Sequence, residues 1–134
     1  MNAQQITLVQ QSFAQVIPIA ETAATLFYDR LFILDPSVKA LFKGDMKQQG
    51  HKLMSALGFV VKGLQQLETI LPTVQALGKR HTSYGVRAEH YQTVGAALLW
   101  TLEQGLGEAF TSEVRDAWAA AYSLLATVMQ EAAV

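Results

Sequence analysis

The sequence contains no cysteine, few charged residues and only three prolines. The lack of cysteine excludes disulfides, thiolate nucleophiles, iron–sulfur clusters and cysteine-ligated zinc. It also excludes cofactors attached through thioether bonds, such as c-type haem. Charged residues make up 16% of the 134-residue chain, against about 25% in an average domain. Because the formal net charge is only -1, we expect neither a disordered chain nor a basic surface that binds nucleic acid.

Long hydrophobic runs and targeting signals are lacking as well. The N-terminus has no basic region followed by an apolar stretch, so no signal peptide is indicated. The longest uncharged apolar stretch, residues 117–129, is shorter than the roughly 20 residues that span a bilayer. We therefore predict a soluble, cytoplasmic protein without membrane contact, with residues 1–134 forming one domain.

The sequence does contain helical periodicity, with apolar residues recurring every three or four positions in several segments. Asp35 followed by Pro36 is typical of a helix start, and Pro72 is expected to open another helix. Gly107 is expected to follow the end of a helix, and Thr111 to cap the last one. Since no alternating strand pattern is present, we predict an all-α protein with six or seven helices.

Three histidines are the main candidates for chemistry, because the usual enzyme motifs are absent. His51 lies about 200° around a helix from Leu53, so we expect it on the surface. His90 is only partly in phase with its apolar neighbours, and we expect it at the rim of the core. His81 follows Leu77 by four residues and shares its apolar face, so we expect it to be buried or nearly so.

Two roles are open for His81. Pattern alone favours a core histidine bonded to a backbone carbonyl, and the alternative is an axial ligand to a cofactor. Zinc would need three converging protein ligands, which these histidines do not supply. A macrocycle that provides the other four ligands needs only one histidine, so a haem protein is the metalloprotein class that the sequence permits most readily.

Tyr28 and Gln49 are polar residues on apolar helix faces. Pattern alone favours a tyrosine whose hydroxyl bonds to the backbone and a glutamine at a fraying helix end. The alternative is a pair of donors directed into an apolar small-molecule site.

Five segments, in this order and covering essentially the whole chain, resemble the bacterial single-domain globins and the haem domain of flavohaemoglobins. They are FYDRLF (27–32), DPSVKALF (35–42), KRHTSYGV (79–86), EHYQTVG (89–95) and AWAAAY (117–122).

The resemblance implies a globin fold, a three-over-three helical sandwich around a non-covalently held haem b. His81 then corresponds to the proximal iron ligand, and Tyr28 and Gln49 to distal donors of hydrogen bonds to dioxygen. Phe42 corresponds to the phenylalanine that wedges against the haem. The apolar neighbours that the resemblance places around the haem are Leu53, Leu77, Val86, Tyr91, Val94, Leu98 and Met129.

The function that this resemblance implies is reversible binding of dioxygen, for storage or delivery, with other diatomic gases as further ligands. The alternative is dioxygenation of nitric oxide with an external reductase, and a haem-based gas sensor ranks third. Flavohaemoglobins continue into flavin and nicotinamide domains, whereas this sequence ends at Val134, so we expect iron reduction to need a separate reductase.

One residue departs from the flavohaemoglobin pattern. Ala133 stands where that family has a glutamate that reaches the proximal histidine, and Glu131 lies two residues too early. We therefore expect His81 to donate a hydrogen bond to a backbone carbonyl instead, and peroxidase-like chemistry to lose its usual support.

Overall fold

The computed structural model describes residues 1–132, in which every regular element is a helix. The predicted all-α class is therefore confirmed. The α-helices are α1 (Ala3–Val16), α2 (Ala20–Leu34), α3 (Met46–Gly63), α4 (Leu67–Ser83), α5 (Ala88–Leu106) and α6 (Ser112–Ala132). Short 3₁₀ helices lie between them: η1 (Ile17–Ile19), η2 (Pro36–Leu41), η3 (Leu64–Gln66) and η4 (Gly107–Ala109).

Helix ends follow the chemistry of the residues that flank them. The Thr111 hydroxyl accepts a hydrogen bond from the Val114 N–H at 3.2 Å, as expected of a cap on α6. The Asp35 carboxylate accepts from the Ser37 N–H at 3.1 Å, although the element it opens is η2 rather than an α-helix. After α5, Gly107 has φ +56°, a left-handed conformation that glycine adopts without steric strain.

Pro72 lies inside α4, so the prediction that it opens a helix is wrong. The missing N–H removes one backbone hydrogen bond from that helix. Ile70 and Val74 lie one turn apart on either side of the proline, and both are buried in a cluster with residues of α6. Burial of these two side chains offsets the lost bond and extends the helix back to Leu67.

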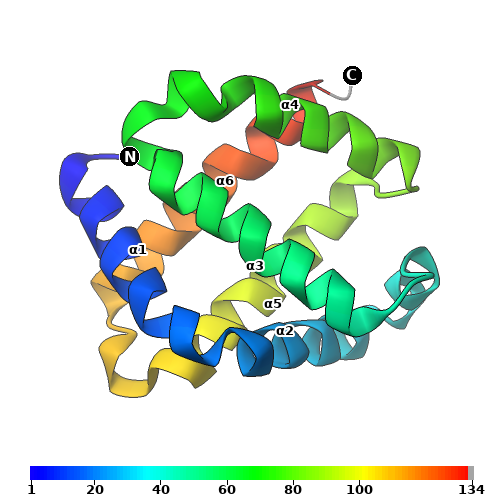
Figure 1. Ribbon diagram of the computed structural model, residues 1–134, viewed down its shortest axis with the longest axis horizontal. Helices are drawn as coiled ribbons and strands as arrows, with labels where there is room; N and C mark the ends of the chain where they lie inside the picture. Colours follow the sequence, from blue (N-terminus) through cyan, green and yellow to red (C-terminus); the bar gives the residue numbers. More distant parts are fainter. Residues whose placement is uncertain (133–134) are drawn as a thin grey trace.

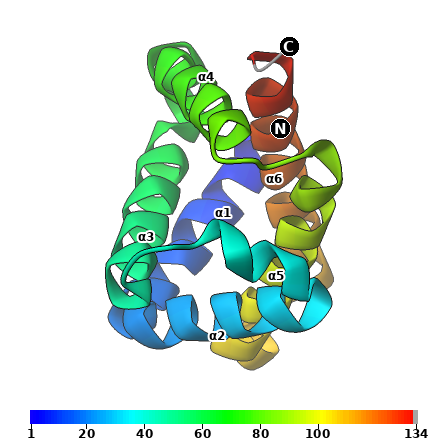
Figure 2. The ribbon, with the colours of Figure 1, turned by 90° about the vertical axis from the view of Figure 1, so that its right-hand side faces the viewer.

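The helices form two layers. In Figure 1, α3 and α4 lie toward the viewer and α5 and α6 pass behind them. The side view of Figure 2 separates α3 on one side from α5 on the other, with α2 below. The most extensive helix contacts join α2 to α5, α4 to α6 and α1 to α6. With α1, α3 and α4 in one layer and α2, α5 and α6 in the other, this is the predicted three-over-three arrangement.

The apolar interior is divided into two clusters. The larger one holds α1, α2, α5 and α6 together around Phe13 and Trp118, whose rings lie 6.2 Å apart. The smaller one lies between α4, α5 and α6 and contains Ile70, Val74 and Met129. Within residues 1–132, none of the helices is long and apolar enough to cross a membrane.

Close packing of α4 on α6 depends on Gly78. A Cβ atom at this position would overlap the backbone of Met129, its carbonyl oxygen most of all. By contrast, α3 and α4 contact each other far less than α4 contacts α6. Packing is therefore tight where α4 meets α6 and looser between α3 and α4.

Candidate functional site

Helices α2 and α3 bring two polar side chains together in an apolar environment. Tyr28 is buried on α2 and Gln49 is half-buried on the first turns of α3. The Gln49 Nε2 atom donates a hydrogen bond to the Tyr28 hydroxyl oxygen at 3.2 Å. The two helices can approach at this point because Gly50 places only hydrogen against the Ala24 methyl group. The structure thus brings together two of the residues that the sequence analysis singled out.

Aromatic rings surround the Tyr28 side chain. Their centroids lie 5.0 Å away for Phe27, 5.3 Å for Phe42 and 6.1 Å for Phe32. Burial raises the pKa of the Tyr28 hydroxyl, against a smaller lowering by the Gln49 hydrogen bond, so the group keeps its proton. Since Gln49 donates to the oxygen, that proton remains available, and residues 1–132 offer it no acceptor.

His81 lies on α4 with its two ring nitrogens in different surroundings. Nδ1 lies 2.8 Å from the Leu77 carbonyl oxygen, which can only accept, so Nδ1 carries the hydrogen. This confirms the expected bond from His81 to a backbone carbonyl. Burial lowers the His81 pKa, opposed by the Leu77 bond and aided by nearby Arg80, so the ring is neutral at neutral pH. Nε2 then holds a free lone pair, with no hydrogen-bond partner in the described part of the chain.

The side chains around His81 suit a metal whose other ligands are supplied by a cofactor. Among residues 1–132, no three histidine, aspartate or glutamate side chains are close enough to hold a bare metal ion. One neutral imidazole can nevertheless serve as an axial ligand to iron in a macrocycle. The fixed Nδ1–H orients the ring and makes Nε2 a better ligand.

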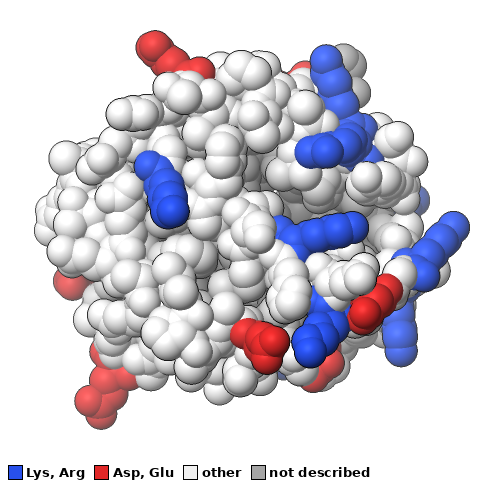
Figure 3. Space-filling view, in the orientation of Figure 1, with Lys and Arg blue, Asp and Glu red and all other residues white. Residues whose placement is uncertain are grey.

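Apolar side chains on the elements around His81 and Gln49 are left partly exposed. Phe42 and Val94 pack against the larger cluster and Val86 against the smaller one, and none of them is fully buried. Leu53 and Leu77 are half-buried in the same way, one against each cluster. Figure 3 shows a hollow on this face between α3 and α4. Side chains of this kind and exposure fit a flat, largely apolar cofactor such as haem.

The other predicted pocket residues lie deeper. Leu98 is buried in the larger cluster and lines a small apolar cavity with Leu53 and Phe27. Tyr91 and Met129 are buried in the smaller cluster. Burial raises the pKa of the Tyr91 hydroxyl, and the Tyr91 backbone carbonyl accepts a hydrogen bond from the Tyr122 hydroxyl.

Tyr84 was not predicted from the sequence as part of the site. Its ring centroid lies 6.3 Å from that of His81, and 63% of the residue is exposed. The spacing of three residues, which places side chains on neighbouring positions of a helix, could have indicated this contact.

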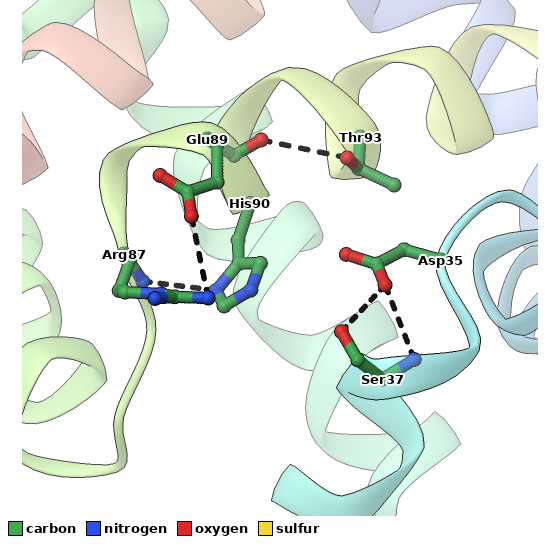
Figure 4. Close-up of polar contacts among 6 residues, drawn as sticks. All are labelled: Asp35, Ser37, Arg87, Glu89, His90 and Thr93. Carbon is green, nitrogen blue, oxygen red and sulfur yellow. Dashed lines mark hydrogen bonds and ion pairs between the residues drawn. The ribbon is translucent and has the colours of Figure 1, made fainter.

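Two further sequence expectations concern the remaining histidines. His51 is exposed, 3.8 Å from the Glu21 carboxylate, so its surface position is confirmed. His90 is only 6% exposed, so its placement at the rim is wrong. Its Nδ1 accepts a hydrogen bond from the Arg87 N–H at 2.9 Å, and Figure 4 shows the ring between Arg87 and Asp35. Capping α5 from within draws this side chain inward.

One further sequence expectation concerns Ala133, which stands where flavohaemoglobins have a glutamate. Ala133 lies outside the described residues, and Glu131, two residues earlier, is exposed.

The sequence matches known globins over most of its length. The family model described as Globin matches residues 25–129. The chain is 39% identical to a flavohemoprotein of Bordetella parapertussis over 106 residues, 77% of this chain and 26% of that protein. It is 35% identical to a flavohemoprotein of Vibrio cholerae over 119 residues, 84% of this chain and 30% of that protein. The chain thus spans between a quarter and a third of the length of these relatives.

Solved structures give the same result for the fold. A bacterial globin from Campylobacter jejuni superposes with a TM-score of 0.86 at 26% identity, covering 98% of this chain and 96% of that one. An engineered carbene transferase, based on a putative nitric oxide dioxygenase from Rhodothermus marinus, superposes with a TM-score of 0.89 at 25% identity, covering 99% and 93%. Together with the family match over residues 25–129, these similarities show that the chain belongs to the globin family.

Proposed function

We propose that this chain binds dioxygen reversibly through a non-covalent haem b, in a single globin domain of residues 1–134. The observation that carries the proposal is the free hydroxyl proton of Tyr28, which is buried among aromatic rings and lacks an acceptor among residues 1–132. A diatomic ligand with partial negative charge is the kind of acceptor that such a donor fits.

His81 would hold the haem iron through Nε2, and the iron supplies the position at which a diatomic gas is held. Tyr28 would donate its hydroxyl proton to that gas. Gln49, whose amide carries a second hydrogen, would orient the hydroxyl and add a weaker bond of its own. The half-buried apolar side chains would cover the two faces of the cofactor and exclude water, which slows oxidation of the iron. They are Phe42, Leu53, Leu77, Val86 and Val94, with Tyr91, Leu98 and Met129 behind them.

The second candidate function is nitric oxide dioxygenation with an external flavin reductase. The names of the flavohemoprotein relatives and of the Rhodothermus marinus structure favour this possibility. The same Tyr28 and Gln49 donors serve both functions, because both begin with dioxygen held in the site. Sustained consumption of nitric oxide by the reconstituted protein with a flavin reductase would place this function first. A single stoichiometric reaction would leave dioxygen binding as the function.

The dioxygen off-rate of the Tyr28→Phe variant tests the proposed function. Loss of a charge-assisted hydrogen bond worth about 1.5–3 kcal/mol should speed release roughly 10- to 150-fold. The haem-reconstituted, reduced and oxygenated protein is mixed with carbon monoxide in a stopped-flow spectrometer, and the off-rate is read from the spectral change.

Tyr84→Phe is the matched control, since it removes an exposed tyrosine hydroxyl from a residue that lies beside His81 rather than beside Gln49. Its off-rate should equal that of the unmodified protein. An unchanged off-rate in Tyr28→Phe, or a protein without haem absorption after reconstitution, would contradict the proposal.

A further inference from the structure

The near-zero net charge of the chain conceals a strong separation of charge along the sequence. Residues 36–87 contain eight Lys and Arg against two Asp and Glu, a net charge of +6. The rest of the chain contains two Lys and Arg against nine Asp and Glu, a net charge of -7. The positive segment comprises η2, α3, η3 and α4. Of these elements, α3 and α4 lie on either side of the hollow in Figure 3, which is the candidate haem cleft.

Exposed cations directly adjoin several predicted pocket residues in the sequence. Figure 3 shows most of the basic side chains of this face in its right half, next to and beyond the hollow between α3 and α4, with acidic side chains among them below the hollow. Each of four exposed cations is the sequence neighbour of a predicted pocket residue, Phe42, Leu53, His81 or Val86. We call these four cations the basic rim: Lys43, Lys52, Arg80 and Arg87.

The rim has further features of a protein-binding surface. Tyr84, whose ring is close to that of His81, is a largely exposed aromatic residue between Arg80 and Arg87 in the sequence. Aromatic residues and arginine are enriched in protein interfaces. Arg87 pairs with Glu89 at 3.3 Å, whereas Lys43 and Lys52 form no ion pair within residues 1–132. The propionates of a bound haem would neutralise part of this charge, and the remaining cations would keep the rim positive.

We propose that the basic rim docks an acidic flavoprotein that serves as the electron donor of this globin. The inference rests on the proposed function, because a haem that must be ferrous to bind dioxygen needs a donor that approaches the cleft opening. Complementary charge would steer an acidic donor to that opening and fix its orientation. A recessed site favours a protein, which can enter the hollow, over a flat lipid bilayer.

Binding of a purified acidic flavodoxin to the haem-loaded protein tests the proposal without any measurement of dioxygen. The dissociation constant is determined by isothermal titration calorimetry at low ionic strength and again with added salt. We expect binding that weakens steeply with salt. Lys52→Glu, which reverses one rim charge, should weaken binding about tenfold, and Lys52→Arg should restore it.

Arg115→Glu is the matched control. It makes the same change in net charge at an exposed position on α6, outside the positive segment. Its affinity for flavodoxin should stay within about twofold of the unmodified protein. Equal weakening by Lys52→Glu and Arg115→Glu would show that net charge alone acts, and would overturn the rim as a docking site. Lys43→Glu provides a second rim variant, and thermal melts establish that each variant is folded.

Anionic vesicles test the competing partner. Co-sedimentation is measured with vesicles of phosphatidylglycerol and phosphatidylcholine, with the same variants. Binding to these vesicles through Lys52, without binding to flavodoxin, would overturn the proposal and assign the rim to a membrane surface. If flavodoxin binds but the dioxygen measurements fail, the proposed function is contradicted and the docking site is not. If the dioxygen measurements succeed but flavodoxin does not bind, only the docking site is contradicted.

Discussion

At the scale of single residues, the two nitrogens of His81 have separate tasks. The Leu77 carbonyl holds the hydrogen on Nδ1, and the neutral ring leaves the lone pair of Nε2 free. Tyr28 is divided in a similar way, because its oxygen accepts from Gln49 while its proton remains free to donate. In both side chains, one fixed hydrogen bond inside the protein determines which atom is available to a ligand.

The His81→Ala variant should hold haem much less tightly than the unmodified protein. Groups that merely orient a metal ligand are worth roughly 10- to 100-fold in metal affinity, so removal of the ligand itself should exceed that loss. The measurement is the rate of haem transfer to an excess of apomyoglobin, followed by absorbance. His51→Ala, which removes an exposed histidine, should transfer haem at the unmodified rate. Equal rates in the two variants would rule out His81 as the iron ligand.

At the scale of helices, small residues and caps determine where the elements lie. Gly78 allows α4, the helix that carries His81, to press closely on α6. Asp35 opens η2, which leads the chain from α2 to Phe42 and then to α3. The candidate site depends on α4 and η2, because α4 carries His81 and η2 leads directly into Phe42.

Gly78→Ala should destabilise the protein by about 1–3 kcal/mol, the range for an overpacked interior. The added methyl group would overlap the Met129 carbonyl, so α4 must shift away from α6. Urea unfolding followed by circular dichroism measures the change. Gly44→Ala is the control, since its methyl group would meet no atom within 4 Å. A Gly78→Ala variant as stable as Gly44→Ala would mean that this close approach is absent in solution.

The contribution of Asp35 should depend on pH. The Ser37 hydroxyl, which donates to the carboxylate, is the main cause that lowers the Asp35 pKa from its usual value. A carboxyl whose pKa is lower in the folded state stabilises that state when it is ionised. The stabilisation is present at pH values above about 4, the pKa in the unfolded chain, and is lost as the pH falls through the lower folded value.

Thermal melts of Asp35→Ala and the unmodified protein, between pH 7 and pH 3, measure this dependence. The difference in melting temperature should be largest near neutral pH and should shrink on acidification. A difference that grows as the pH falls would contradict the assigned sign.

At the scale of the whole molecule, contacts between distant parts of the sequence close the two layers. The Trp118 indole N–H on α6 donates to the Ser12 hydroxyl on α1 at 2.8 Å, and both residues are buried. The Ser12 hydroxyl in turn donates to the Leu8 carbonyl of its own helix. This chain of bonds ties the N-terminal helix to the C-terminal one at the centre of the larger cluster.

Ser12→Ala should lower the free energy of unfolding by about 1–3 kcal/mol, because the buried indole N–H loses its acceptor. Chemical denaturation followed by tryptophan fluorescence reports the change. Thr7→Ala provides the comparison, since the Thr7 hydroxyl also bonds to a carbonyl of α1 but is exposed. Equal stabilities of the two variants would show that the bond to Trp118 contributes nothing.

Several features of this protein follow from the order of its residues alone. They are the helical class, the capping of α6 by Thr111 and the inward face that holds His81 and Leu77. These features depend on spacing along one helix, and the geometry of a helix is the same in every protein. The absence of cysteine likewise excludes a haem attached through thioether bonds, whatever the arrangement of the helices.

How the helices meet was settled by tertiary packing. Packing joined Gln49 to Tyr28, drew His90 inward and kept Pro72 inside α4. These outcomes depend on the distances and angles between helices, which are set by close approaches such as those at Gly50 and Gly78 and by burial summed over many side chains. A periodic pattern in one helix carries no information about those distances.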